Sequence, residues 1–126
     1  MWLYKSRAFT LIELLVVVAI IGTLSAIGIP MFRGLIDSSH KSEAETTMQS
    51  IYLAEQEYKS NNGNYYYSSN TNSIVNELFD GVDDLTGQKY TYTITGSSSS
   101  GTLCIRATRS GKTTLYLNHL KKKTNC

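Results

Sequence analysis

The chain has 126 residues, the length of one domain rather than two. Its formal net charge of +2 and mean hydropathy of −0.19 exclude a strongly cationic protein and indicate a chain that is soluble on average. These averages hide a run without charged side chains from Leu14 to Phe32, after which Ser, Thr, Asn and Tyr are frequent. Loss of an N-terminal leader containing Lys5 and Arg7 would reduce the basic residues from 12 to 10, equal to the 10 acidic ones.

The apolar run is long enough to cross a membrane. A helix that spans about 30 Å of hydrocarbon needs about 20 apolar residues, and Leu14 to Phe32 nearly supplies them. Lys5 and Arg7 on its N-terminal flank predict that this end stays cytoplasmic and that the rest of the chain lies outside the cytoplasm. A cleaved secretory signal would have a shorter core and an A-x-A-like site. A plain signal anchor explains the basic flank and the apolar run, but it does not explain Glu13.

Glu13 is a carboxylate within the apolar segment that begins at Phe9 and continues into this run. Its insertion costs about 2.5–3.5 kcal/mol even on the milder scales, so it is a functional candidate that needs a named partner. If the chain is cut between Ala8 and Phe9, a new α-amino group appears one helical turn before Glu13. The amine of one subunit could then pair with the carboxylate of a staggered neighbour. We therefore interpret Glu13 as a residue that fixes the register of assembly.

The helical pattern continues after Arg33. An apolar stripe at spacings of three, four and seven predicts a helix packed on the chain's own sheet. The stripe consists of Ala44, Met48, Ile51, Tyr52 and Tyr58. The acidic residues of this segment, Glu55 among them, are placed mostly on the other faces. The helix is predicted to end at Asn61-Asn62-Gly63, because Gly63 suits a left-handed position after the last turn.

A polar, tyrosine-rich loop and three strands are predicted to follow. The loop, residues 64–87, contains a short helix over Ile74 to Phe79, and Tyr65 to Tyr67 are expected to pack and hydrogen-bond against the sheet. Asp80, Asp83 and Asp84 do not have the spacing of a calcium-binding EF-hand loop and are interpreted as an acidic turn. Period-two alternation over 90–95, 103–107 and 115–117 predicts an antiparallel meander.

The cations and anions are segregated along the sequence, because no acidic residue follows Asp84. Basic side chains near the C-terminus could contact the phosphates of DNA without sequence preference, and Tyr116 could add a stacking surface. These side chains are Arg106, Arg109, Lys112, Lys121, Lys122 and Lys123. We favour the alternative that they face solvent or the acidic helix and loop of a neighbouring subunit. Enzyme motifs are absent, so neither catalysis nor a cofactor is predicted.

The residues from Lys5 to Glu13, K-S-R-A-F-T-L-I-E, resemble the prepilin cleavage motif of type IV pilins and of type II secretion pseudopilins. The family usually has Gly where this chain has Ala8. The resemblance implies that a prepilin peptidase cuts after Ala8 and methylates the amine of Phe9. It also implies that Gly22 and Pro30 mark a break in the helix, which first anchors the subunit in the inner membrane and later bundles in the core of an extracellular filament.

Two cysteines complete the inventory. An even number in a chain with an export signal favours a disulfide, and pilins of this family carry a C-terminal loop bounded by one. A bond between Cys104 and Cys126 would close about 20 residues and contribute about 3 kcal/mol in the chain-entropy model. A metal site that uses His119 with both cysteines has too few ligands for structural zinc, so no metal is predicted.

The resemblance implies a pilin-like α+β fold. A long N-terminal helix has a protruding hydrophobic half and an amphipathic half packed on a small antiparallel sheet with a C-terminal disulfide loop. The expected divisions are a cleaved leader at 1–8, a transmembrane and filament-core helix at 9–36, and a globular head at 37–126. Within the head we expect helix at 37–62, a loop at 63–88, the sheet at 89–118 and the disulfide-bounded loop at 104–126.

The function implied is that of a structural subunit of a type IV pilus, serving adhesion, twitching motility or DNA uptake. The alternatives are a minor pilin, a secretion pseudopilin, or a competence pilin that binds DNA. The disulfide loop favours a pilin over a pseudopilin. The partners implied are further copies of the chain, the prepilin peptidase, the inner-membrane assembly machinery and, before assembly, the membrane itself.

Overall fold

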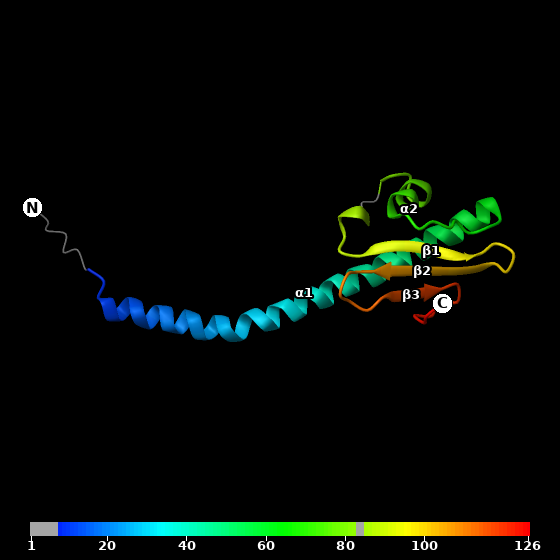
Figure 1. The fold of residues 1–126 in the computed structure, drawn as a ribbon. Coiled ribbons are helices and arrows are strands. Elements are labelled where there is room, and N and C mark those ends of the chain that lie inside the picture. The colour runs from blue at the N-terminus through cyan, green and yellow to red at the C-terminus, as the bar shows by residue number, and fades with distance from the viewer. Residues whose placement is uncertain (1–7, 83–84) are drawn as a thin grey trace, which may run out of the picture. The chain divides into compact units, whose positions relative to one another are not determined.

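The computed structural model describes residues 8–82 and 85–126 (Figure 1). The predictions for Lys5, Arg7, Asp83 and Asp84 concern residues outside this range. The elements are the helices α1 (Leu11–Asn62) and α2 (Thr71–Leu78), the 3-10 helix η1 (Leu85–Gly87), and the strands β1 (Thr91–Ser97), β2 (Thr102–Thr108) and β3 (Leu115–Asn118). The chain divides into two compact units, with the boundary between Asp37 and Ser38.

The first unit is the apolar part of α1. Every residue from Ala8 to Ile36 is exposed, so this segment buries no side chain against the protein. By its length and composition the helix is able to cross a membrane. The helix runs without interruption through Gly22 and Pro30. An opening of the helix between these two residues in a filament therefore stays a prediction about the assembled state.

The second unit, which we call the head, is built on the C-terminal part of α1. This part packs on a three-stranded antiparallel sheet of order β1-β2-β3, as the alternating pattern predicted. Ala44, Met48 and Ile51 of the helix are almost completely buried, whereas Tyr58 is only half-buried and lies outside the core cluster. The sheet contributes alternate residues to the same core: Tyr92, Ile94, Leu103, Ile105, Ala107 and Leu117.

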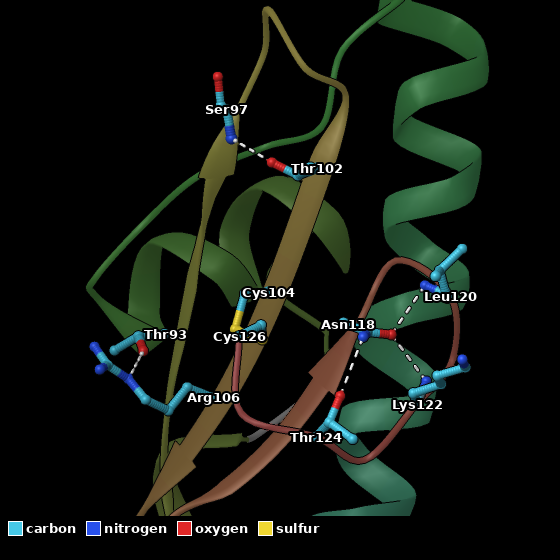
Figure 2. The surroundings of a disulfide bond; sticks show 10 residues. All are labelled: Thr93, Ser97, Thr102, Cys104, Arg106, Asn118, Leu120, Lys122, Thr124 and Cys126. Carbon is cyan, nitrogen blue, oxygen red and sulfur yellow. Dashed lines mark hydrogen bonds between the residues drawn. A yellow bond between two sulfur atoms is a disulfide. The ribbon is translucent and has the colours of Figure 1, made fainter.

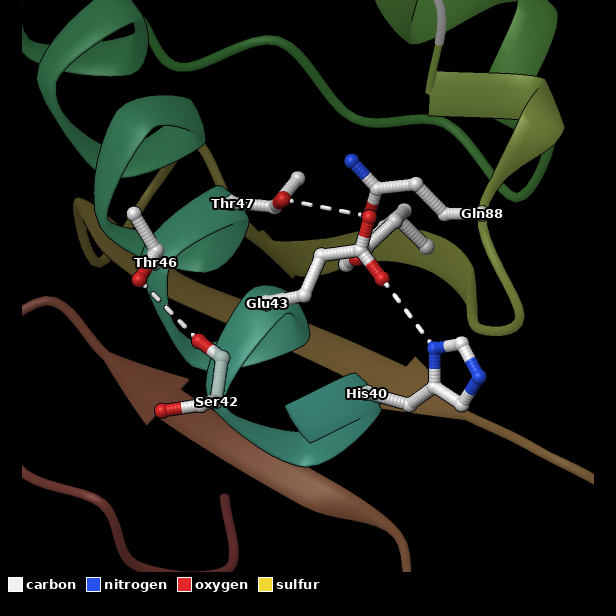
Figure 3. A network of polar contacts seen from close by, with 7 residues as sticks. His40, Ser42, Glu43, Thr46, Thr47 and Gln88 are labelled. Atoms are coloured by element: carbon white, nitrogen blue, oxygen red, sulfur yellow. Dashed lines mark hydrogen bonds and ion pairs between the residues drawn. The ribbon is translucent and has the colours of Figure 1, made fainter. Parts of the chain in front are cut away.

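Gln88 connects the helix to the sheet just before β1. Its side-chain oxygen accepts hydrogen bonds from Thr47 of α1, at 3.1 Å, and from the hydroxyl of Tyr92 in β1. Figure 3 shows the Thr47 bond beside a second polar pair on α1, in which His40 Nδ1 lies 3.4 Å from Glu43 Oε2. Because buried polar atoms are usually hydrogen-bonded, this shared acceptor favours the full burial of Tyr92.

The loop between α1 and β1 begins with the predicted end of the helix. Gly63 has φ +82° and donates to the Lys59 carbonyl, which confirms the predicted termination. Helix α2 begins at Thr71 rather than at Ile74, because the Asn70 side chain accepts the Asn72 N–H at 2.8 Å and caps the helix there. The hydroxyl of Thr71 bonds to the backbone of β1, which places α2 beside that strand (Figure 1).

The tyrosines after Gly63 attach the loop to the head as predicted. Tyr65 is buried and its hydroxyl accepts a hydrogen bond from Gln56, and the Tyr67 hydroxyl donates to the Thr102 carbonyl at 3.0 Å.

Glu55 corrects the predicted face assignment. It belongs to the buried stripe of α1, four residues after Ile51, and is 0% exposed. One carboxylate oxygen accepts the Tyr66 N–H at 2.9 Å, and the other, also buried, has no hydrogen-bond partner. Desolvation raises the pKa of this carboxyl group from 4.5 to about 7, against the lowering effect of the Tyr66 bond. The folded head therefore favours the protonated acid more than the unfolded chain does.

The folded-state pKa of Glu55 lies above its unfolded-state value, so protonation of Glu55 stabilises the folded head. This contribution to the free energy of unfolding is present below pH 4.5 and is lost as the pH rises to about 7. A shift of this size corresponds to about 3 kcal/mol. We expect Glu55→Gln to flatten this dependence, since the amide oxygen still accepts the Tyr66 bond. Denaturant unfolding of the full chain in detergent, followed by the near-ultraviolet circular dichroism of the tyrosines, measures it. Glu57→Gln, at an exposed site on the same helix, is the control and should keep the wild-type slope.

Candidate functional site

The predicted processing site lies just outside the helix. Ala8, Phe9 and Thr10 precede α1 and have no helical structure, and Phe9 is 84% exposed. The bond between Ala8 and Phe9 is therefore in exposed, non-helical backbone, where a peptidase can reach it without unwinding α1.

Thr10 and Glu13 form a reciprocal cap at the start of α1. The Thr10 N–H and the Thr10 hydroxyl lie 3.0 and 3.1 Å from the same Glu13 carboxylate oxygen, Oε2. In return, the Glu13 N–H lies 3.3 Å from the Thr10 hydroxyl oxygen. This is a capping box, which satisfies backbone donors that an α-helix leaves unpaired at its N-terminus. The Glu13 carboxylate thus has a hydrogen-bond partner, Thr10, within its own chain.

The helix that follows this cap is exposed along its whole apolar length. Its large side chains from Leu11 to Ile36 lie in no core of the chain. Single exposed apolar residues are ordinary, but a continuous apolar surface of this size indicates contact with a membrane or with protein. The capped end and this surface are parts of one element, which offers an extended apolar contact surface.

At the other end of the chain, a disulfide joins Cys104 of β2 to Cys126, with 5.9 Å between their Cα atoms (Figure 2). Asn118, at the end of β3, organises the intervening tail. Its side-chain oxygen accepts the N–H groups of Leu120 and Lys122 at 3.0 and 2.9 Å, and its amide nitrogen donates to Thr124 at 3.3 Å. This role of Asn118 was not predicted, although Asn at the end of a short strand is a common turn signal.

The predicted basic cluster is divided by the fold. Arg109 and Lys112 lie at the β2–β3 connection, whereas Lys121 to Lys123 follow β3 at the opposite end of these antiparallel strands.

Several of these cations are engaged within the head. Lys123 Nζ lies 2.6 Å from Glu45, Lys121 lies 5.6 Å from the Tyr52 ring, and Arg106 donates to Thr93 on β1 at 3.3 Å. The arrangement favours the interpretation as solvated and packing side chains over a continuous phosphate-binding track. Within residues 8–82 and 85–126, no three His, Cys, Asp or Glu side chains are grouped to hold a metal ion.

Residues 3–29 match the model of the prokaryotic N-terminal methylation motif, which contains Ala8, Phe9 and Glu13. The chain is 36% identical over 94 residues to the type IV major pilin protein PilA of Myxococcus xanthus (strain DK1622), covering 75% of this chain and 39% of that protein. The chain belongs to the type IV pilin family. Pilins of this family are structural, non-enzymatic proteins.

Two further relatives are similar to this pilin. A fimbrial protein of Moraxella nonliquefaciens is 34% identical over 65% of this chain and 49% of its own length. The type II secretion system core protein G of Pectobacterium carotovorum subsp. carotovorum is 32% identical over 49% of this chain and 40% of its own length. The matches thus span less than half the length of these relatives. No solved structure matches the chain.

The cap predicts a local effect of Thr10. Thr10→Val keeps the shape of the side chain but removes the hydroxyl, which costs about 1 kcal/mol of helix N-terminus stability. We expect the Glu13 amide to exchange its hydrogen about five-fold faster in the full chain in detergent micelles, measured by NMR. Thr10→Ser is the matched control and should exchange like the wild type. Equal rates in the valine variant would show that the cap does not hold the helix end.

The disulfide predicts a global effect on the head. Replacing both Cys104 and Cys126 by Ser should lower its free energy of unfolding by about 3 kcal/mol, because the reduced unfolded chain is less constrained. Denaturant unfolding of the full pilin in detergent measures this difference. Wild-type pilin that has been reduced should match the double variant, and an unchanged midpoint after reduction would contradict the prediction.

Proposed function

We propose that this pilin is a structural subunit of an extracellular type IV pilus, cut after Ala8 and N-methylated at Phe9. The observation that supports the proposal is the apolar half of α1, which is exposed from its first residue to Ile36. At about 25 cal/mol per Å² of apolar surface, exposure of such a helix to water is unfavourable. It therefore needs lipid before assembly and the helices of other subunits afterwards.

The proposal gives the precursor a defined location. The apolar segment anchors it in the inner membrane with the N-terminus in the cytoplasm, and the head, with its disulfide, lies on the oxidising side. The prepilin peptidase and the assembly machinery then act on the anchored chain. The fibre is exposed on the bacterial surface, where it serves adhesion, twitching motility or DNA uptake.

Glu13 has the capacity for the pairing that assembly requires. An ionised carboxylate offers about four acceptor positions, and the two Thr10 donors approach only one of its oxygens. The methylated amine of Phe9 from a neighbouring subunit can therefore bind without displacing the cap. In an apolar surrounding such a pair is stronger than in water, so a subunit that enters out of register leaves a costly unpaired charge.

The processing is tested by mass analysis of protein from sheared surface fibres and from membranes. The proposal expects a fibre species that starts at methylated Phe9 and is two hydrogens lighter for the Cys104–Cys126 bond. Chains that start at Met1 and occur only in the membrane would contradict the filament and leave a signal-anchored protein.

The charge of Glu13 is tested separately from its cap. Glu13→Gln keeps a capping-box residue, since Gln serves at this position as Glu does, but it removes the negative charge. We expect normal leader removal and normal membrane levels, with a yield of sheared fibres reduced about tenfold or more. Immunoblots of the two fractions measure both quantities, with Glu57→Gln as the control. Wild-type fibre yield from Glu13→Gln would exclude the proposed ion pair.

A further inference from the structure

A groove lies between β3 and the part of α1 that belongs to the head. Its volume is about 250 Å³, and we call it the β3 groove. Buried Met48 and Leu117, with half-buried Leu115, provide apolar side chains. Among the described residues, Lys41, Glu45, Gln49 and Lys123 also line it.

The rim of the β3 groove is basic. Lys41 is exposed, and Lys123 pairs with Glu45, the only acidic residue in the lining. Lys122, also exposed, belongs to the same tail as Lys123. Among the described lining residues, two lysines against one acid leave a net positive charge beside an apolar floor. The chemistry suits a small apolar side chain that is flanked by carboxylates.

The turn after α2 presents such a side chain. Val82 is 87% exposed, more than any other large hydrophobic residue described in the head. The turn is hydrogen-bonded, because the Val82 N–H donates to the Phe79 carbonyl at 2.9 Å, and Asp80 and Gly81 both have left-handed backbone with φ +51° and +72°. Phe79 itself packs against the core. The Val82 side chain is therefore held outward by a pre-formed turn, which lowers the entropy cost of docking it.

The flanks of Val82 are acidic. Asp80 and Glu77 are exposed and precede it on the same turn and helix. This turn follows α2, which bonds to β1, and β3 is the other edge strand of the sheet (Figure 1). The β3 groove lies beside that edge strand. Two different, complementary surfaces at opposite edges of one head cannot form a closed two-fold dimer through themselves. A contact between them would be head-to-tail, which closes into a ring or extends as a helical filament.

We propose that the Val82 turn of one copy of this chain docks in the β3 groove of the next copy in the fibre, with Asp80 facing Lys41. This inference rests on the proposed function, since the fibre supplies the neighbouring copy. The contact is small and adds to the packing of the apolar helices. Its contribution is to orient one head against the next.

A pair of introduced cysteines tests the contact. Val82→Cys and Gln49→Cys are combined in the full chain and expressed in cells that assemble type IV pili. Sheared fibres are oxidised and separated on a non-reducing gel. We expect a ladder of covalent oligomers from the double variant and monomers from each single variant. The matched control combines Val82→Cys with Ser99→Cys, an exposed residue of the β1–β2 turn, and should also run as monomer.

The outcomes separate this inference from the proposed function. Double-variant fibres that assemble but stay monomeric on the gel overturn the docking while leaving the pilus intact. A ladder from the Ser99 control that equals the Gln49 ladder also overturns it, because the turn then has no defined partner. Absence of fibres from the wild type contradicts the proposed function instead.

A measurement on wild-type fibres needs no variant. A carbodiimide joins a carboxylate to an amine in contact, and the 2.6 Å pair of Glu45 and Lys123 is an internal positive control. We expect a second amide between Asp80 or Glu77 and Lys41 or Lys122, identified by peptide mass. Mixed isotope labelling before assembly must assign this link to two different copies. The Glu45–Lys123 link without any link from Asp80 or Glu77 overturns the docking.

Discussion

The head depends on the packing of one stripe of α1 against the inner face of the sheet. Ala44, Met48 and Ile51 meet the alternate residues of β1 and β2, and full burial of side chains such as Ile51 contributes roughly 2 kcal/mol each. The loop after α1, the cap of α2 and the disulfide tail all attach to elements that this packing has already placed. The N-terminal half of the same helix is exposed from Leu11 to Ile36 and packs on none of the residues that the structure describes. The C-terminal half thus completes a core, whereas the N-terminal half leaves its apolar side chains open to other molecules.

The exposed apolar half of α1 also contains a carboxylate, Glu13, which is energetically unfavourable in an apolar surrounding. The capping box lowers this cost, because Thr10 donates two hydrogen bonds to the Glu13 carboxylate and accepts one from the Glu13 N–H. Any helix that begins inside an apolar surrounding has unpaired N–H groups, and these are as costly there as the acid is. Glu13 and the helix end thus reduce each other's cost before assembly. The remaining capacity of the carboxylate is what the proposed pairing with Phe9 uses.

Much of this fold could be predicted, because local patterns encode it. The apolar run, the termination at Gly63, the alternating strands and the single cysteine pair are each visible in the sequence. The predicted face of Glu55 was wrong, because charged residues are rarely buried and the prediction followed that rule. Its spacing from Ile51 places it on the buried stripe. The Asn118 contacts and the exposed Val82 depend on how the tail and the α2 turn fold back, which periodicity does not encode.

The two edges of the sheet explain why heads would meet through side chains. Ser68 exchanges both backbone hydrogen bonds with Ile94, and Thr71 bonds to Tyr92, so the outer edge of β1 is occupied. At β3, the Asn118 N–H bonds to the Lys122 carbonyl, and the tail that makes this bond is tied to β2 by the disulfide. Exposed strand edges invite indiscriminate pairing with other chains. Partial closure of both edges disfavours strand addition and leaves shape and charge, as in the Val82 turn and the β3 groove, to select the neighbour.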